Sequence, residues 1–230
     1  MGSKQKLDKT DSNLRVEIQV KQLTQVKNER LLDVQIDHNL SWEAQVKKQK
    51  QVILFKISLL KKIKKYLPIT TRKLFYNFYI KPHFEYCNTI WAHSKVNSDK
   101  IAKLQKYAAR IILDEKLQRE NTVPSAVLFK KLNWTTFRQN SHFRQALLIY
   151  KSLNNLTPQY MRNMFQYVNE VAPRALRSST QSKLYQPKAH PKSIRFTGPK
   201  IWNSLNAEIR NAKSVKQFKK QYLKHMPLQY

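Results

Sequence analysis

Residues 42–66 read WEAQVKKQKQVILFKISLLKKIKKY, and this stretch carries the clearest secondary-structure signal in the chain. Its apolar residues recur at steps of three and four, the period of an α-helix with one buried face; they are Trp42, Val46, Ile53, Ile57, Leu60 and Ile63. Asn39 and Ser41 are candidate N-caps, and Pro68 ends the pattern. Eight lysines against one glutamate give the segment a net charge of +7. The sequence therefore predicts a long helix whose exposed face is strongly cationic.

Two further helical patterns follow this helix. Thr70 or Thr71 is expected to cap the first, and its predicted apolar stripe consists of Leu74, Phe75, Phe78 and Tyr79. Pro82 is expected to bend or break it. The second opens at Asn97 or Ser98, with a predicted buried face of Ile101, Leu104, Ala108, Ile111 and Ile112. Its opposite face carries Lys103, Lys106 and Arg110 at spacings of three and four, so two helices present basic rows.

The rest of the chain continues with shorter helical signals. Pro124 marks a helix start, Thr135 or Thr136 caps a helix over 137–153, and Thr157-Pro158 precedes one over 159–165. From residue 172 onward, prolines punctuate segments that we expect to be extended. Short terminal helices are then predicted to start at Ile201 and Ser214.

The N-terminal region predicts β-structure. Apolar and polar residues alternate strictly over 14–20, which indicates a strand with one buried face, and a second short strand is expected over 31–36. We expect the two to pair antiparallel. The predicted fold class is α+β and predominantly α-helical: a flexible N-terminus at 1–13, a hairpin at 14–40, a helical bundle at 41–116, further helices at 117–168 and a basic C-terminal region of extended segments and short helices at 169–230.

The charge balance indicates the kind of partner. The chain has 44 Lys and Arg against 14 Asp and Glu, a formal net charge of +30 on 230 residues. Self-repulsion on this scale weakens a compact fold unless a polyanion neutralises it, so nucleic acid is the predicted partner. Lysines outnumber arginines, and lysine contacts phosphate oxygens as a point charge, so we expect little sequence discrimination among RNA, DNA or a hybrid. The predicted phosphate contacts are Lys47, Lys61, Lys62, Lys64, Lys65, Arg72, Lys103, Lys106 and Arg110.

Composition excludes several classes of protein. The only glycines are Gly2 and Gly198, which excludes the glycine-rich phosphate loop and the dinucleotide-binding fingerprint. Cys87 is the single cysteine, so the chain forms no internal disulfide and no multi-cysteine zinc site. We expect no cofactor, no metal, no transmembrane segment and an intracellular protein of the nucleus or cytoplasm. The composition leaves the oligomeric state open.

Two small groups of side chains could carry chemistry. Asp33 and Asp37 lie four residues apart and could share a face, as in metal-dependent nucleases, but we interpret them as a solvated strand edge. His83, Cys87 and His93 could bind zinc or form a nucleophile pair. They lie among aromatic residues, so packing in the core is the stronger interpretation. No catalytic residue is predicted.

Ordered blocks of the sequence resemble a known family. Residues 31–37 read LLDVQID and are followed by NLSW at 39–42. Later blocks are KKIKKYLP at 61–68, KPHFEYC at 81–87 with IW at 90–91, LQKYAARII at 104–112, LNW at 132–134, ALLIYK at 146–151, LTPQY at 156–160, WNSL at 202–205 and EIR at 208–210. In this order they resemble the C-terminal part of reverse transcriptases from non-LTR retrotransposons (LINE elements) of the jockey-like type, over nearly the whole chain from about Val26.

The resemblance implies a role for each region. The first block resembles the primer-grip hairpin at the end of the palm, and the helices after it resemble the thumb, which holds the template and primer duplex. The family's polymerase aspartates belong to an upstream Asp-Asp motif, and this sequence contains no Asp-Asp pair. The resemblance thus implies a thumb-bearing segment that does not polymerise alone.

The chain departs from the family at three glycine positions. Asp33 replaces the glycine of the grip hairpin, Ala92 the one after Trp91, and Leu113-Asp114 the Thr-Gly pair that follows Ile112. A carboxylate at Asp33 would repel a primer backbone. We therefore predict a non-catalytic nucleic-acid-binding module. The alternatives left open are a polymerase fragment that is active only with the missing palm and fingers, and an interaction protein for anionic membranes or acidic partners.

Overall fold

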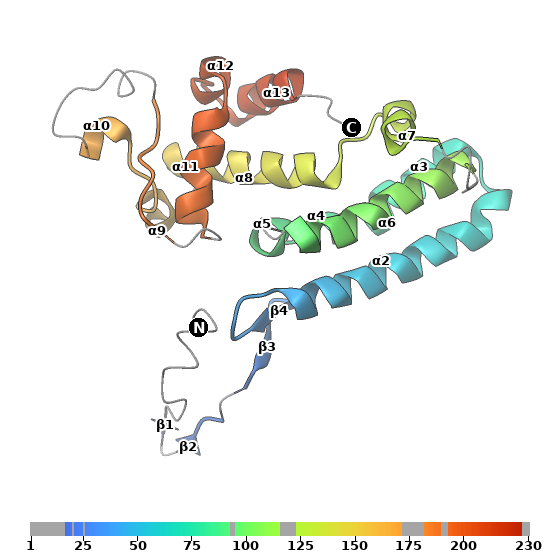
Figure 1. The fold of residues 1–230 in the computed structure, drawn as a ribbon, viewed down its shortest axis with the longest axis horizontal. Coiled ribbons are helices and arrows are strands. Elements are labelled where there is room, and N and C mark those ends of the chain that lie inside the picture. The colour runs from blue at the N-terminus through green and yellow to red at the C-terminus, as the bar shows by residue number, and fades with distance from the viewer. Residues whose placement is uncertain are drawn as a thin grey trace. The chain divides into compact units, whose positions relative to one another are not determined.

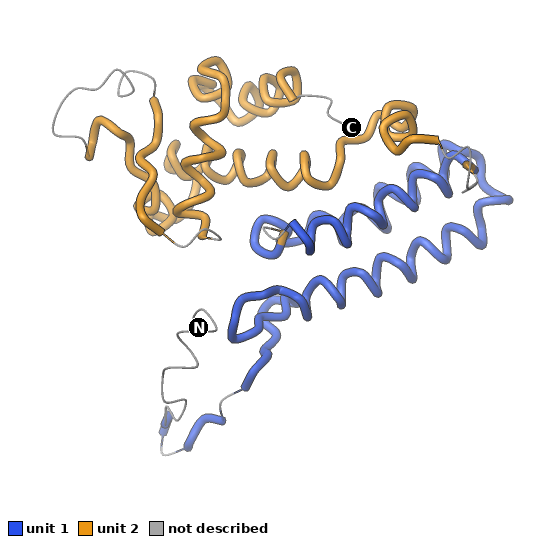
Figure 2. Tube along the Cα trace, viewed as in Figure 1, with its two compact units in different colours: residues 1–91, 95–114 blue, residues 92–94, 115–230 orange. Residues whose placement is uncertain are grey.

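A computed structural model of the chain describes residues 17–19, 21–24, 26–92, 95–115, 123–171, 182–189 and 193–226. The predicted α+β class, predominantly helical, is confirmed: small antiparallel hairpins precede a series of helices (Figure 1). The chain divides into two compact units (Figure 2). Unit 1 comprises residues 1–91 and 95–114, and unit 2 comprises 92–94 and 115–230. The predicted flexible segment at 1–13 lies outside the described residues.

The N-terminal region forms two separate hairpins. β1 (Glu17–Ile18) pairs antiparallel with β2 (Lys21–Gln22), and β3 (Asn28–Leu31) pairs antiparallel with β4 (Val34–Asp37). The predicted pairing of 14–20 with 31–36 is wrong. Leu32 and Asp33 both have positive φ, 48° and 64°, and form a two-residue turn inside the segment predicted as one strand.

Three helical rods make up the rest of unit 1. The first is α2 (Glu43–Ile63), which continues into the 3-10 turn η1 (Lys64–Tyr66). The second is continuous through α3 (Ile69–Phe75), the π-helical η2 (Tyr76–Ile80) and α4 (Lys81–Glu85), and it is followed by the short α5 (Asn88–Trp91). The third is α6 (Lys95–Leu113), whose five predicted apolar residues are all buried.

Contacts at the two ends of the bundle set the direction of its helices. The Asn97 side-chain amide, near the start of α6, donates to the Ser41 carbonyl just before α2, over 3.1 Å. Lys64, just after α2, pairs with Asp114, just after α6. The helices α2 and α6 therefore run parallel, and the rod from α3 to α4 returns between their ends.

The second rod differs from the sequence prediction in two ways. Its buried residues are Tyr76, Ile80 and Phe84, whereas Leu74 and Phe78, from the predicted stripe, are 53% and 78% exposed. The π-helical turn places extra residues in one turn, so the faces before and after it are out of phase with a regular α-helix. The rod also does not break at Pro82. Pro82 lies in the first turn of α4, directly after the π-helical turn, and the rod is helical on both sides of it.

Unit 2 contains the remaining described helices. They are α7 (Ser125–Leu132), α8 (Phe137–Leu153), α9 (Gln159–Arg162), α10 (Val168–Val171), α11 (Ile194–Ser204), α12 (Ala207–Arg210) and α13 (Val215–His225). The predicted bounds of α8 are confirmed, and so is its cap. The Thr136 hydroxyl accepts from the Gln139 N–H, and the Gln139 side chain accepts from the Thr136 N–H.

One hydrophobic core joins α8, α11, α12 and α13 in unit 2. Its side chains come from both sides of the boundary that we predicted between residues 168 and 169. They are Ala146, Ile149, Tyr150, Phe165, Leu184, Trp202, Leu205, Ile209, Ala212, Phe218 and Tyr222. The prediction of extended structure around Pro199 is wrong, because α11 is helical through Gly198 and Pro199. A Cβ atom at Gly198 would lie 2.6 Å from Cε1 of Phe165, so this helix depends on close packing that the proline pattern does not reveal.

Candidate nucleic-acid interface

Basic side chains gather at the end of unit 1 where α2 and α6 finish. Lys61 and Lys62 are exposed in the last turn of α2, and Lys65 is exposed in η1. The ion pair between Lys64 and Asp114 places the end of α6 beside this turn. We call the region the bundle end and define it as Lys61, Lys62, Lys64, Lys65, Tyr66 and Arg110. Cations here also interact favourably with the negative ends of two parallel helix dipoles.

The residues of the bundle end differ in how free their charges are. Lys64 is half-buried and paired with Asp114, so the fold already neutralises part of its charge. Lys65 lies with its Nζ 4.7 Å from the centre of the Tyr66 ring, in a cation–π contact. Arg110 donates to the Lys106 carbonyl over 3.5 Å. Lys61 and Lys62 project into solvent.

Tyr66 is a candidate that the sequence did not single out. It is 74% exposed and lies among the lysines of the bundle end. An exposed aromatic ring beside a group of cations can stack on an unpaired base. Pro68 is the sequence signal that points to this exposure. Because the helix ends there, Tyr66 is not part of the buried stripe of α2.

Lys103, Lys106 and Arg110 form a basic row on α6, which we call the α6 row, and it extends away from the bundle end. Lys103 and Lys106 are exposed and lie about 10 and 6 Å before Arg110 along the helix axis. They are on the face opposite the buried residues of α6, as the sequence predicts. The structure thus places Lys103, Lys106 and Arg110 on one outward stripe.

Two of the predicted phosphate contacts, Lys47 and Arg72, are not part of the bundle end. Lys47 is exposed but lies about 25 Å from Lys64 along α2, so it does not join the bundle end. The half-buried Arg72 guanidinium holds parts of the bundle together: its Nε donates to the Leu67 carbonyl over 2.8 Å and its Nη1 to the Ile112 carbonyl over 3.2 Å. Because two of its donors bind carbonyls at the end of α6 and before α3, Arg72 has a structural role here.

The two aspartates considered as a metal site have separate roles. The buried Asp37 accepts from the backbone N–H groups of Ser41 and Trp42, each over 2.8 Å, and so orders the entry to α2. Burial alone would raise the pKa of Asp37, but these hydrogen bonds outweigh burial and lower it. The interpretation as a solvated strand edge is therefore wrong for Asp37.

Asp33 lies in the exposed turn between β3 and β4. Its carboxylate binds Lys48 over 2.6 Å and also pairs with Arg30. The hydrogen bond from Lys48, aided by Arg30, lowers the pKa of Asp33. The carboxylate that the resemblance places against a primer is therefore already neutralised by two cations.

Two members of the histidine and cysteine group, His83 and Cys87, lie in the described residues. Cys87 and His83 are half-buried, and His93 lies outside the described residues. Burial, together with the nearby Lys56, lowers the pKa of His83. In the described part of the chain, no cluster of three or more His, Cys, Asp or Glu residues could hold a metal ion. None of the described helices is both long and apolar enough to cross a bilayer.

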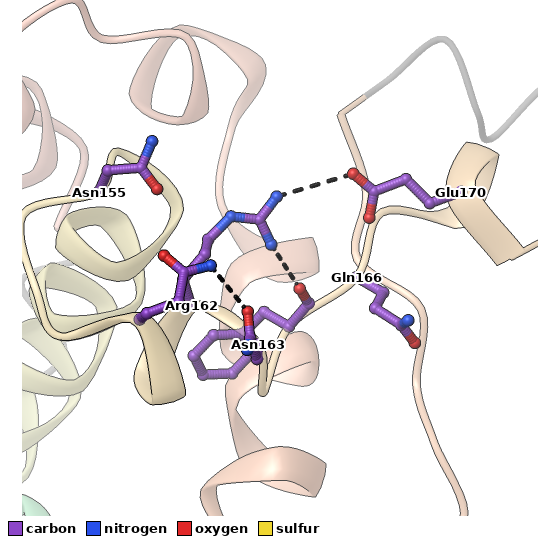
Figure 3. A pocket seen from close by; sticks show the side chains of 7 residues that line it. Asn155, Arg162, Asn163, Gln166 and Glu170 are labelled. Atoms are coloured by element: carbon purple, nitrogen blue, oxygen red, sulfur yellow. Dashed lines mark hydrogen bonds and ion pairs between the residues drawn. The ribbon is translucent and has the colours of Figure 1, made fainter.

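Unit 2 contains a polar hollow of about 440 Å³ beside α9 and α10 (Figure 3). Arg162 is its main charged group. Its Nη1 donates to the Phe165 carbonyl over 2.7 Å, and its Nη2 lies 3.7 Å from Oε1 of Glu170. Because Glu170 already offsets part of the charge of this guanidinium, the hollow offers weaker attraction for an anion than the exposed lysines do.

A second hollow of about 410 Å³ lies between α8, α12 and α13. His142 and Tyr222 line it, and Nδ1 of His142 is hydrogen-bonded to the Tyr222 hydroxyl. Burial lowers the pKa of His142 and raises the pKa of Tyr222 to about 12. Both groups are therefore neutral at pH 7, and the pair joins α8 to α13.

Comparison of the chain with models of protein families, with curated proteins and with solved structures finds no match. The relationship to reverse transcriptases therefore stays a prediction.

Proposed function

We propose that the chain is a non-catalytic nucleic-acid-binding module whose main contact is the bundle end, continued by the α6 row. The observation that carries this proposal is the convergence of Lys61, Lys62 and Lys65, all exposed, where two parallel helices finish. Like charges held this close repel one another, and a phosphate backbone converts that repulsion into attraction while releasing counterions. The ligand is RNA, DNA or their hybrid, bound through its backbone with little sequence discrimination.

Tyr66 adds a second kind of contact to this proposal. Stacking of a base on an exposed aromatic ring contributes about 1–3 kcal/mol and works for every base. The bundle end thus combines phosphate-binding lysines with one stacking ring. This combination fits a ligand that exposes an unpaired base next to a backbone, such as the end of a duplex.

The proposed origin is the thumb region of a non-LTR retrotransposon reverse transcriptase. The backbone at two of the three departing positions supports it. Asp33 has φ 64° and Asp114 has φ 59°, the left-handed conformation that favours glycine, and the resembled family has glycine at both positions. A chain that inherited these turns and later lost the glycines would have this combination of backbone and sequence.

Salt-dependent binding measurements test the proposed function. Fluorescence anisotropy with a labelled DNA duplex, an RNA–DNA hybrid and single-stranded RNA gives the slope of log affinity against log salt. We expect a slope of about −0.9 per phosphate neutralised on B-DNA. In the variant Lys61→Gln/Lys62→Gln/Lys65→Gln, the slope should be shallower by about 2 to 3.

A matched control separates the site from net charge. Lys27→Gln/Lys50→Gln/Lys95→Gln removes the same three charges from exposed positions of unit 1 outside the bundle end. Equal losses in both variants would show that charge alone matters, and absence of binding in dilute buffer would refute the proposal. Primer extension by the chain alone would refute its non-catalytic part.

A further inference from the structure

The helix α13 presents lysines along the face opposite its buried side. Phe218 is 0% exposed and Tyr222 is 6% exposed. The Phe218 ring lies 4.5 Å from the Tyr150 ring, and the Tyr222 ring lies 5.0 Å from the Phe143 ring, measured between centres. These contacts with α8 fix the rotation of α13 about its own axis, so its outward face is determined by the core.

Lys216, Lys220 and Lys224 follow one another at steps of four on that outward face, and we call them the α13 lysine row. They span about 12 Å along the helix. All three are exposed, and Lys213 and Lys219 are exposed beside them. The start of the helix is ordered by Ser214, whose hydroxyl accepts from the Gln217 N–H over 3.1 Å. The lysines are therefore held in a fixed array on a capped helix.

The described carboxylates of unit 2 are paired elsewhere. A carboxylate oxygen of Glu115 lies 3.4 Å from Nζ of Lys131, and one of Glu170 lies 3.7 Å from Nη2 of Arg162. A carboxylate oxygen of Glu208 lies 3.6 Å from Nε2 of His225, a contact that is an ion pair only when the histidine is protonated. Within the part of unit 2 that the structure describes, none of them pairs with the α13 lysine row. Like charges at steps of four destabilise a helix, so this row has an energetic cost that no described contact offsets.

We propose that the α13 lysine row is a second phosphate-binding face, separate from the bundle end, so that the chain contacts nucleic acid with both units. The inference rests on the proposed function for the class of ligand, but on different residues. Two linked faces raise the effective concentration of the second contact once the first is made. A long nucleic acid would then bind more tightly than either face alone could achieve.

The packing of α13 distinguishes this ligand from a membrane. An amphipathic helix binds a bilayer by burying its apolar side among the lipids. In α13 that side is already packed into the core of unit 2 through Phe218 and Tyr222. Leu223 is the large apolar side chain of α13 that is exposed, at 54%, so the row offers mainly charge, which suits a phosphodiester backbone.

The test uses the full chain in three variants. The row variant is Lys216→Gln/Lys220→Gln/Lys224→Gln. The bundle-end variant is Lys61→Gln/Lys62→Gln/Lys65→Gln. The control, Lys130→Gln/Lys188→Gln/Arg195→Gln, removes three exposed charges from separate segments of unit 2. With a labelled long duplex, the row variant should flatten the salt slope by about 2 to 3 units and weaken binding about tenfold, and the control should lose much less.

The outcomes separate this inference from the proposed function. A row variant that behaves like the control overturns the second face, whatever the bundle-end variant does. A bundle-end variant without effect, beside a weakened row variant, overturns the primary site and leaves the second face standing. A row variant that loses binding to phosphatidylserine vesicles but keeps duplex binding overturns the inference in favour of a membrane.

A measurement on the unaltered chain removes any dependence on variant folding. Bound duplex should protect Lys216, Lys220 and Lys224 from acylation by an amine-reactive ester and leave Lys130 and Lys188 reactive. Equal labelling of both sets with and without duplex would overturn the second face.

Discussion

At the scale of single residues, two aspartates occupy backbone positions that favour glycine. Asp33 and Asp114 both have left-handed φ, and each carboxylate pairs with a lysine, Lys48 and Lys64 respectively. The left-handed conformation costs a residue with a side chain more than it costs glycine. Each aspartate therefore strains the backbone locally and neutralises a cation that could otherwise contact a phosphate.

Substitution of Asp114 separates these two effects. Asp114→Gly and Asp114→Ala both release Lys64, but only glycine suits the left-handed backbone after α6. We expect the glycine variant to be more stable than the alanine variant by about 1 kcal/mol in urea unfolding. Both should bind nucleic acid more tightly than the parent chain. An alanine variant as stable as the glycine variant would mean that the backbone at this position carries no strain.

At the scale of elements, unit 2 depends on close contacts between helices and their neighbours. Gly198 brings α11 against Phe165. The Leu184 N–H donates to Oδ1 of Asn203, in the same helix, and Nδ2 of Asn203 donates to the Leu184 carbonyl, each over 2.8 Å. These contacts hold an extended segment against α11 in the manner of a strand partner.

Gly198→Ala tests the contact between α11 and Phe165. Alanine normally stabilises a helix relative to glycine by about 1 kcal/mol. Here the new Cβ would lie 2.6 Å from the Phe165 ring, so we expect a net loss of about 1–3 kcal/mol in unfolding free energy. Adding Phe165→Leu should recover part of the loss by making room, and the exposed Arg195→Ala serves as a neutral control. A stabilised Gly198→Ala variant would contradict the contact.

The burial of His142 makes unit 2 sensitive to pH. Burial lowers the pKa of His142 in the folded chain, whereas the unfolded chain titrates near the ordinary value of about 6.5. The unfolded state therefore binds more protons just below that value. The stabilisation from neutral His142 is complete above it and is lost as the pH falls towards the folded pKa.

Thermal unfolding between pH 8 and pH 5 measures this effect. The midpoint temperature of unfolding should decrease in the parent chain as the pH is lowered. It should decrease less in His142→Gln, which removes the titrating group. Equal pH dependence in the two proteins would assign the effect to other groups, such as His83, whose pKa is also lowered.

At the scale of the whole molecule, the net charge of +30 opposes compactness. Salt screens this repulsion, so the melting temperature should rise as sodium chloride increases from about 20 to 300 mM. A gain of about 1 kcal/mol corresponds to about 2–4 °C for a chain of this size. Inorganic polyphosphate at equal ionic strength should raise it further. A melting temperature that falls with salt would show that attractive ion pairs dominate.

Sequence patterns predicted some parts of this structure well. The cap at Thr136 and the apolar spacing of α6 are local signals, and each depends on residues within a few positions of one another. The exposed lysines of α2 and α6 follow from the same helical period. Where a structure depends on neighbours in the sequence, one sequence is sufficient to predict it.

Other parts depended on contacts between distant segments. The π-helical turn before Pro82 changed which aromatic residues are buried, and α11 is helical through Pro199 and packs closely against Phe165 at Gly198. The role of Arg72 depends on the Ile112 carbonyl, 40 residues away. No periodic pattern encodes such distances.

The sequence by itself determined the charge, the helical class and the outward faces of α2 and α6, because composition and helical period are local properties. Only the tertiary structure decided which cations meet. It brings Lys61, Lys62 and Lys65 to one bundle end, leaves Lys47 far along α2, and turns Arg72 inward. The physical reason is that burial of apolar faces fixes how helices align, and the charged groups take the positions that this alignment leaves at the surface.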